Sequence, residues 1–246
     1  MNPLTYLGLA SCVLIAATVG GLFGIGTASI LLPILSYYMG VRFAVPVVGI
    51  GMIFANVSRA IFSWRSVDWK AVIAFSSAAV PTSIIGALIF VGSSPQWIGA
   101  FVGITILVLV PLRRLTNRWN VHTQLKHLPI VGGTIGMISG MGGATGPVAA
   151  PFLISYGLVK SSYLGTDGVN ATLMHSIKTI VYWMNGSVNQ AQLQLGLVYG
   201  AIMVLGSYLG RRLVDRLNIQ TYTISIECCT LALGSAMLLQ TIFHPK

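Results

Sequence analysis

The stretch Gly24-Ile-Gly-Thr27, followed by Leu-Pro33-Ile-Leu, decides the fold, because it occurs twice in the chain. Its second copy is Gly142-Gly-Ala-Thr145, followed by Ala-Pro151-Phe-Leu. Glycine, threonine and proline match at an offset of 118 residues. Self-similarity over this interval predicts that the chain is built from two related units.

A second pair of segments supports the repeat. Arg59-Ala-Ile-Phe-Ser-Trp64 resembles Lys178-Thr-Ile-Val-Tyr-Trp183 at an offset of 119 residues, and the same offset places Asn56 on His175. A glycine break, a proline, a basic residue and a tryptophan therefore recur in one order. We expect two halves, 1–120 and 121–246, joined by a polar linker at about 113–127.

The composition indicates a membrane protein. Of the 246 residues 55% are apolar and only 7% are charged, whereas soluble domains carry about 25% charged residues. A helix of about 20 apolar residues crosses a hydrocarbon core of about 30 Å. Seven apolar stretches approach or exceed that length: Leu4–Gly21, Phe43–Ser63, Ala71–Gly92, Trp97–Leu112, Tyr163–Met184, Leu193–Gly210 and Ile219–Phe243.

The net charge of +10 comes mostly from short loops, so we read it as the cytoplasmic bias of basic residues rather than as a nucleic-acid surface. Three loops carry this charge: Arg65 with Lys70; Arg113, Arg114, Arg118 and Lys126; and Arg211, Arg212 and Arg216. The loops at 93–96 and 186–190 are uncharged and are expected to be external.

This assignment makes Leu4–Gly40 start and end outside, and Leu128–Leu158 start and end inside. Each segment must enter the membrane and return, as two short helices joined at the glycines. The predicted fold is an all-α polytopic membrane protein with two inverted repeats, each a glycine-broken helical hairpin plus three transmembrane helices. Loop charge does not settle the hairpins, because Arg42 and Lys160 flank opposite faces.

The glycine breaks are candidate anion sites. A short helix starting near Thr27 or Thr145 would offer unpaired N–H groups and the positive end of its dipole. Hydroxyls of Thr27, Ser29 and Thr145 could add donors. The alternative is close helix packing, since Gly20/Gly24 and Gly132/Gly136/Gly140 have the GxxxG spacing.

Two intramembrane cations provide the second candidate feature. Asn56/Arg59 and His175/Lys178 share an i, i+3 spacing, so each pair lies on one helix face, and Asn170 continues the second stripe. We expect the two pairs to line a cavity from opposite sides, with the cations attracting the anion at longer range. The alternative is that Arg59 and Lys178 snorkel to the membrane surfaces.

Proton coupling has three candidate residues. His175 has an unperturbed pKa of about 6.5, while Asp167 and Glu227 are the acids that lie at or within apolar spans. Cys12, Cys228 and Cys229 lack metal-ligand spacing. We therefore expect no metal and no cofactor.

The repeated Gly-x-Gly break followed by a proline resembles the TauE/SafE (TSUP) family of sulfite and organosulfonate exporters, over essentially the whole chain. The matching positions are Gly24, Gly26, Pro33, Gly142, Gly143 and Pro151. The first copy departs from the family pattern at Thr27 and Ala28, where more glycine is common. The resemblance implies transport of sulfite, sulfoacetate or a similar anion across the bacterial inner membrane.

We therefore expect a secondary transporter, and not an enzyme, that works by alternating access with or without proton coupling. A passive anion channel or a transporter of another small anion is the alternative. Ser139 lacks the turn of a serine hydrolase nucleophile. The expected partners are a small anion and the lipid bilayer, without nucleic acid, and a homodimer is left open. The expected substrate-binding residues are Gly24, Gly26, Thr27, Ser29, Asn56, Arg59, Gly142, Gly143, Thr145, Asn170, His175 and Lys178.

Overall fold

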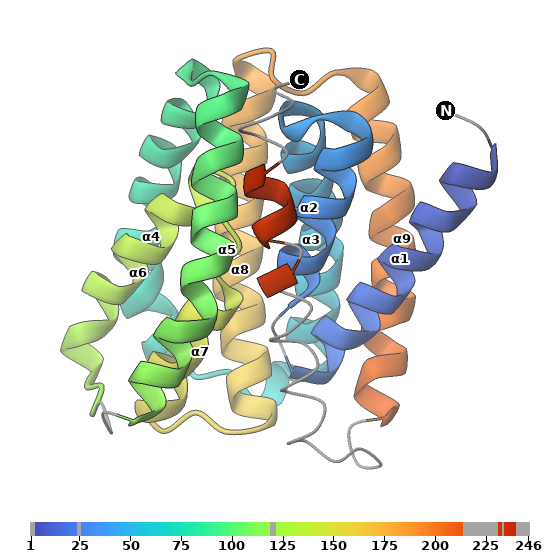
Figure 1. The fold of residues 1–246 in the computed structure, drawn as a ribbon. Coiled ribbons are helices and arrows are strands. Elements are labelled where there is room, and N and C mark those ends of the chain that lie inside the picture. Colours follow the sequence, from blue (N-terminus) through green and yellow to red (C-terminus); the bar gives the residue numbers. More distant parts are fainter. Residues whose placement is uncertain (1–2, 24–25, 119–121, 214–230, 233, 240–246) are drawn as a thin grey trace.

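The computed structural model describes residues 3–23, 26–118, 122–213, 231–232 and 234–239. This part of the chain is all-helical, as predicted, without a strand (Figure 1). Two 3₁₀ turns, Trp64–Ser66 and Leu125–His127, flank longer helices. The helices are α1 Pro3–Phe23, α2 Thr27–Met39, α3 Val41–Phe62, α4 Trp69–Gly92, α5 Pro95–Arg118, α6 Leu128–Gly140, α7 Gly146–Ser155, α8 Ser161–Met184 and α9 Gln190–Leu213.

Within the described residues, α3, α4 and α9 are long and apolar enough to cross a membrane. Helix α8 is equally long but more polar, because it contains Asp167, His175 and Lys178. The span expected at 219–243 lies largely outside the described residues; 231–232 and 234–239 are helical.

Both glycine breaks interrupt the helices where the sequence places them. Gly26 has a φ of 101° just before α2, and Gly142 has a φ of 92° between α6 and α7. Glycine adopts this left-handed region without a steric penalty. In Figure 1, α1 and α2 lead down from one end of the molecule and back to it, whereas α6 and α7 lead up from the opposite end and back.

The length of α1 differs from the expectation of two short helices in each hairpin. Helix α1 has 21 residues, whereas α2, α6 and α7 have 13, 13 and 10. After Pro3 the helix contains no proline, and the hydroxyls of Ser11 and Thr18 donate to carbonyls four residues earlier, so α1 continues up to the break. The first hairpin is therefore asymmetric.

Helices α4 and α6 approach until their backbones touch. A Cβ added to Gly86 would lie 2.3 Å from the carbonyl oxygen of Met137, and one added to Gly140 would lie 2.3 Å from that of Ser83. Small residues at such a crossing allow close helix packing in a membrane. The packing interpretation therefore holds for Gly140, which precedes the break.

Helices α1 and α9 make a crossing of the same kind. A Cβ on Gly210 would lie 2.3 Å from the carbonyl oxygen of Thr18, and one on Gly21 would lie 2.6 Å from that of Ser207. Gly21 and Gly140 are 119 residues apart, which is the offset of the Arg59 and Lys178 segments and one residue more than the offset of the glycine breaks. The first helix of each hairpin thus packs on a long helix of the other half.

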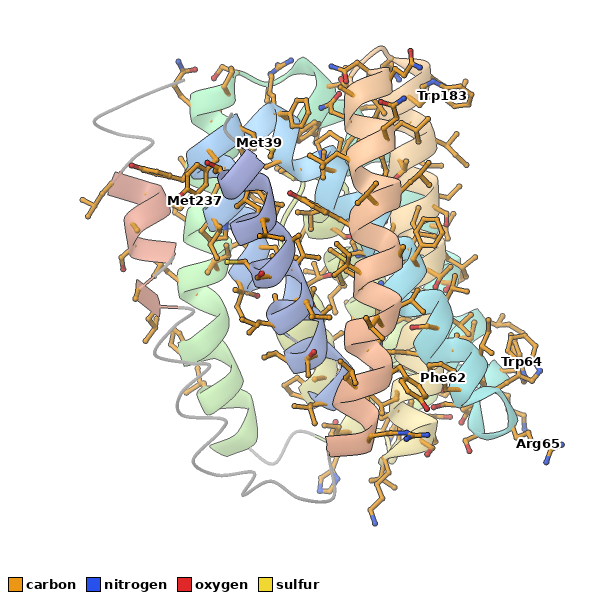
Figure 2. The ribbon with its side chains drawn as sticks, turned by 90° about the vertical axis from the view of Figure 1, so that its right-hand side faces the viewer. Met39, Phe62, Trp64, Arg65, Trp183 and Met237 are labelled. Carbon is orange, nitrogen blue, oxygen red and sulfur yellow. The ribbon has the colours of Figure 1, made fainter. Side chains whose placement is uncertain are left out.

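Helix α3 lies at the centre and packs against α8, α9 and α2. Its buried residues include Asn56 and Arg59, which points to a polar centre in an otherwise apolar core. Figure 2 shows Trp64 and Arg65 at one end of the molecule and Met39 and Trp183 at the other.

Candidate functional site

A cavity of about 30 Å³ lies where the two glycine breaks meet α3. It has room for about two water molecules. Residues from both halves line it: Gly20, Gly26, Thr27, Ala28, Ser29, Met52, Ala55, Asn56, Arg59, Ala144, Gly146 and Ser207. Five of the predicted site residues are among them: Gly26, Thr27, Ser29, Asn56 and Arg59.

The start of α2 forms one wall of the cavity. The first N–H groups of a helix have no carbonyl partner within it. Among the described residues, the first backbone bond of α2 runs from the Ile30 N–H to the Gly26 oxygen, 3.0 Å away. The Thr27 hydroxyl donates to the Ala16 carbonyl across the break, at 3.2 Å. Its proton is therefore not available to an anion, whereas the buried Ser29 hydroxyl has no partner among the described residues.

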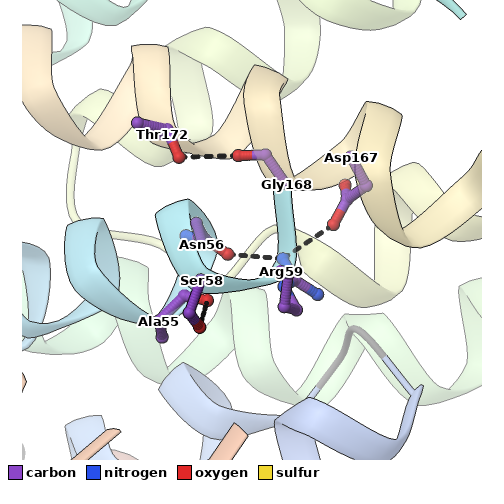
Figure 3. Close-up of polar contacts among 7 residues, drawn as sticks. All are labelled: Ala55, Asn56, Ser58, Arg59, Asp167, Gly168 and Thr172. Atoms are coloured by element: carbon purple, nitrogen blue, oxygen red, sulfur yellow. Dashed lines mark hydrogen bonds and ion pairs between the residues drawn. The ribbon is translucent and has the colours of Figure 1, made fainter. Parts of the chain in front are cut away.

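Arg59 forms the positive side of the cavity. Its Nη2 donates to Asn56 Oδ1 and to Asp167 Oδ2, the latter at 3.0 Å (Figure 3). The Arg59 and Asp167 side chains are only 8% and 6% exposed. Arg59 therefore does not snorkel to the membrane surface, because an ion pair between α3 and α8 holds it inside the protein.

Two buried donors face the same site as Arg59. Asn56 accepts from Arg59 through its oxygen, which leaves its Nδ2 without a partner in the described structure, and the Ser29 hydroxyl is in the same state. Buried polar groups are normally hydrogen-bonded. A cavity lined by an arginine and unpaired donors favours an oxyanion that would accept from them.

The start of α7 contributes less to the cavity. Ala144 and Gly146 line it, but Pro147 has no N–H, and the N–H groups of Val148 and Ala149 both donate to the Thr145 carbonyl. Gly142, Gly143 and Thr145 were expected to bind substrate but do not line the cavity. Glycine at position 142 serves the turn, since a Cβ there would lie 2.8 Å from Val45.

The His175/Lys178 pair does not line this cavity, contrary to the expectation of two pairs on opposite sides. Lys178 Nζ donates to the Ser139 carbonyl at 3.0 Å, and the Tyr182 hydroxyl donates to the Gly140 carbonyl. The Ser139 carbonyl also accepts from the Gly142 N–H at 3.0 Å, so Lys178 and Tyr182 of α8 add side-chain donors to the carbonyl end of α6, where the helix dipole is negative. Lys178 is 3% exposed and is therefore also held inside the protein.

The remaining predicted residues lie on α8 or outside the described chain. His175 is buried, and its Nδ1 has no partner in the part of the chain that the structure describes; Asn170 accepts from the Ser76 hydroxyl of α4 at 2.9 Å. Gly24 and Glu227 fall outside the described residues.

A family model described as sulfite exporter TauE/SafE matches residues 9–237. The chain belongs to this family. The resemblance inferred from the glycine breaks is therefore confirmed, and the chain is a member of a family of membrane transporters. No curated protein and no solved structure matches it.

In this TauE/SafE protein, sequence reasoning missed two parts of the site. It placed Asp167 among the candidates for proton coupling but not beside Arg59, and it did not identify Ser207 of α9 as a wall of the cavity. Both depend on how helices of different halves are rotated against one another. The nearest signal was that Asp167 is an acid within a long apolar stretch, where an ionisable residue usually pairs with another.

Proposed function

We propose that this protein is a secondary transporter that exports sulfite, an organosulfonate or a similar small sulfur-containing anion across the bacterial inner membrane. The observation that carries the proposal is the cavity at the meeting point of the two glycine breaks. It combines Arg59, the positive N-terminal end of α2, and the Ser29 and Asn56 donors that have no partner among the described residues. Membership of the TauE/SafE family supports the sulfur anion as substrate.

Alternating access between two halves, 1–120 and 121–246, is the proposed mechanism. At about 30 Å³ the cavity is too small for an organosulfonate, so the halves must move apart to admit one. The matching crossings of α1 on α9 and α4 on α6 support an inverted repeat, in which the same packing can open on either side.

Coupling to protons is proposed to run through Asp167, with His175 as the second candidate. Arg59 forms an ion pair with the Asp167 carboxylate and also lines the cavity. An anion that takes the guanidinium would leave the carboxylate unpaired and buried, which favours its protonation. Anion and proton would then bind together and cross in the same direction, so the outward gradient of the anion, rather than an inward proton gradient, would drive export.

Flux into reconstituted liposomes tests the function. We expect saturable flux of sulfite or sulfoacetate, slower flux of sulfate, and a response to an imposed pH gradient. Asp167→Asn should abolish the gradient response, whereas His175→Gln should do so only if the histidine carries the proton. Saturable flux that does not respond to the pH gradient would exclude proton coupling but would still support a transporter. Flux of any small anion, without saturation, would favour the passive channel.

A further inference from the structure

Arg42 is a cation at the end of the molecule that lacks the basic loops. It lies in the first turn of α3, three residues after Met39, and Figure 2 shows Met39 at the end opposite to Arg65. The bias of basic residues toward the cytoplasmic loops does not account for an arginine at this end.

An open cavity of about 410 Å³ lies at Arg42. Its walls come from the start of α3, the end of α4 and the loop between α8 and α9. Its polar lining residues are Arg42, Asn185, Ser187, Asn189 and Gln192, and no acidic residue is among the described residues that line it. The cavity is large enough for an organosulfonate, and it carries one full positive charge.

The Arg42 guanidinium is held in place at the rim. Its Nη2 donates to the carbonyl oxygens of Val91, at 3.4 Å, and of Ser93, which end α4. Guanidinium has five N–H donors, so those on Nε and Nη1 remain for a ligand or water. Gln192 Nε2 donates to the Arg42 carbonyl at 3.2 Å, which ties the start of α9 to the start of α3.

We propose that this cavity is a vestibule that binds a small sulfonate or related oxyanion at the external end of the transport path. The place on a path rests on the proposed function, but the binding does not. A fixed arginine beside amide and hydroxyl groups suits the several acceptor oxygens of a sulfonate. Because Arg42 is exposed to water, binding is weak, which lets the anion pass on.

Thiol labelling tests the vestibule without any transport. Cys12, Cys228 and Cys229 are replaced by serine, and Ser187→Cys places a thiol in the cavity. We compare the rates at which this thiol reacts with two methanethiosulfonate reagents. One reagent is anionic and carries a sulfonate, and the other is cationic and carries a trimethylammonium group. Arg42→Gln should lower the ratio of anionic to cationic rates by about tenfold, because one unit charge acts on both reagents in opposite directions. The exposed Arg65→Gln at the other end is the matched control and should leave the ratio unchanged.

Protection then distinguishes binding from a charged rim. Ethanesulfonate, at matched ionic strength, should slow labelling of the Ser187→Cys protein, and this protection should disappear in Arg42→Gln. Arg42→Lys should keep the rate ratio and lose most of the protection, since an ammonium lacks the planar fork. The control Arg65→Gln should keep both. An unchanged ratio in Arg42→Gln, or a changed ratio without protection, would overturn the vestibule whether or not the protein transports.

Discussion

Arg59 takes part in two interactions that compete. It is the ion-pair partner of Asp167, and it is the cation that lines the central cavity. Removing one member of a buried pair leaves the other charge uncompensated, which is costlier than removing both. The stability of variants at these positions therefore reports on the pair, and their anion affinity reports on the cavity.

Asp167→Asn should lower the free energy of unfolding by about 3–5 kcal/mol, because Arg59 stays buried and charged without its carboxylate. The double variant Arg59→Gln/Asp167→Asn should recover part of this loss. Thermal unfolding of purified protein in one detergent measures both. A single variant as stable as the parent protein would show that the pair contributes nothing.

Arg59→Gln should weaken anion binding by about 1–3 kcal/mol, the scale of a lost charged hydrogen bond. Calorimetry with sulfite or a sulfonate on monodisperse protein measures it, with Arg65→Gln as an exposed control. Gly142→Val is a poorer test, because valine would be strained at the φ of 92° and would clash with Val45, 2.8 Å from a Cβ. Equal affinities of the Arg59→Gln and parent proteins would exclude the guanidinium from the site.

At the scale of elements, the two backbone crossings hold the hairpins against long helices of the opposite half. Gly86 on α4 and Gly210 on α9 each approach a carbonyl oxygen of the partner helix so closely that a Cβ would lie 2.3 Å from it. The contact is between backbones, so neither helix can admit a methyl group without moving.

Gly86→Ala and Gly210→Ala should each destabilise the protein by about 1–3 kcal/mol, the usual cost of overpacking. Gly92→Ala on α4 and Gly8→Ala on α1 are matched controls, because a Cβ at either position meets nothing within 4 Å. Their effect should stay within about 0.5 kcal/mol or be stabilising. Melting temperatures of the four variants give the comparison, and a loss at only one of the two crossings would argue against equivalent halves.

The break positions and most helices could be predicted, because apolar runs and glycine-proline signals are local. The turns at Gly26 and Gly142 lie inside the predicted breaks. The i, i+3 spacing also put His175 and Lys178 on one face of α8. It could not show that Lys178 meets the Ser139 carbonyl, since that contact depends on how closely α6 approaches α8.

At the scale of the whole molecule, the hairpins open toward opposite ends (Figure 1), and Arg65 marks one of these ends (Figure 2). The loop charges predict that the Arg65 end is cytoplasmic. The N-terminus and the loop at 93–96 would then be external, and the linker at 113–126 internal.

Cysteine accessibility in intact cells tests this orientation, with Cys12, Cys228 and Cys229 removed. A thiol introduced by Ser94→Cys should react with an impermeant reagent added outside, and one introduced by Arg65→Cys should react only after the membrane is opened. Labelling of Ser94→Cys solely from the cytoplasm would reverse the orientation of the whole molecule.

The polarity of α8 has a consequence for biosynthesis. Asp167 and Lys178 make it a poor substrate for the translocon, since a charged residue costs up to about 2.5–3.5 kcal/mol on insertion, the value at the centre of a span. Helix α3 emerges from the ribosome more than a hundred residues earlier, and it carries Arg59, the partner of Asp167. We expect α8 to insert efficiently only when α3 is already in the bilayer. The Arg59–Asp167 ion pair would then also determine the order in which the helices assemble.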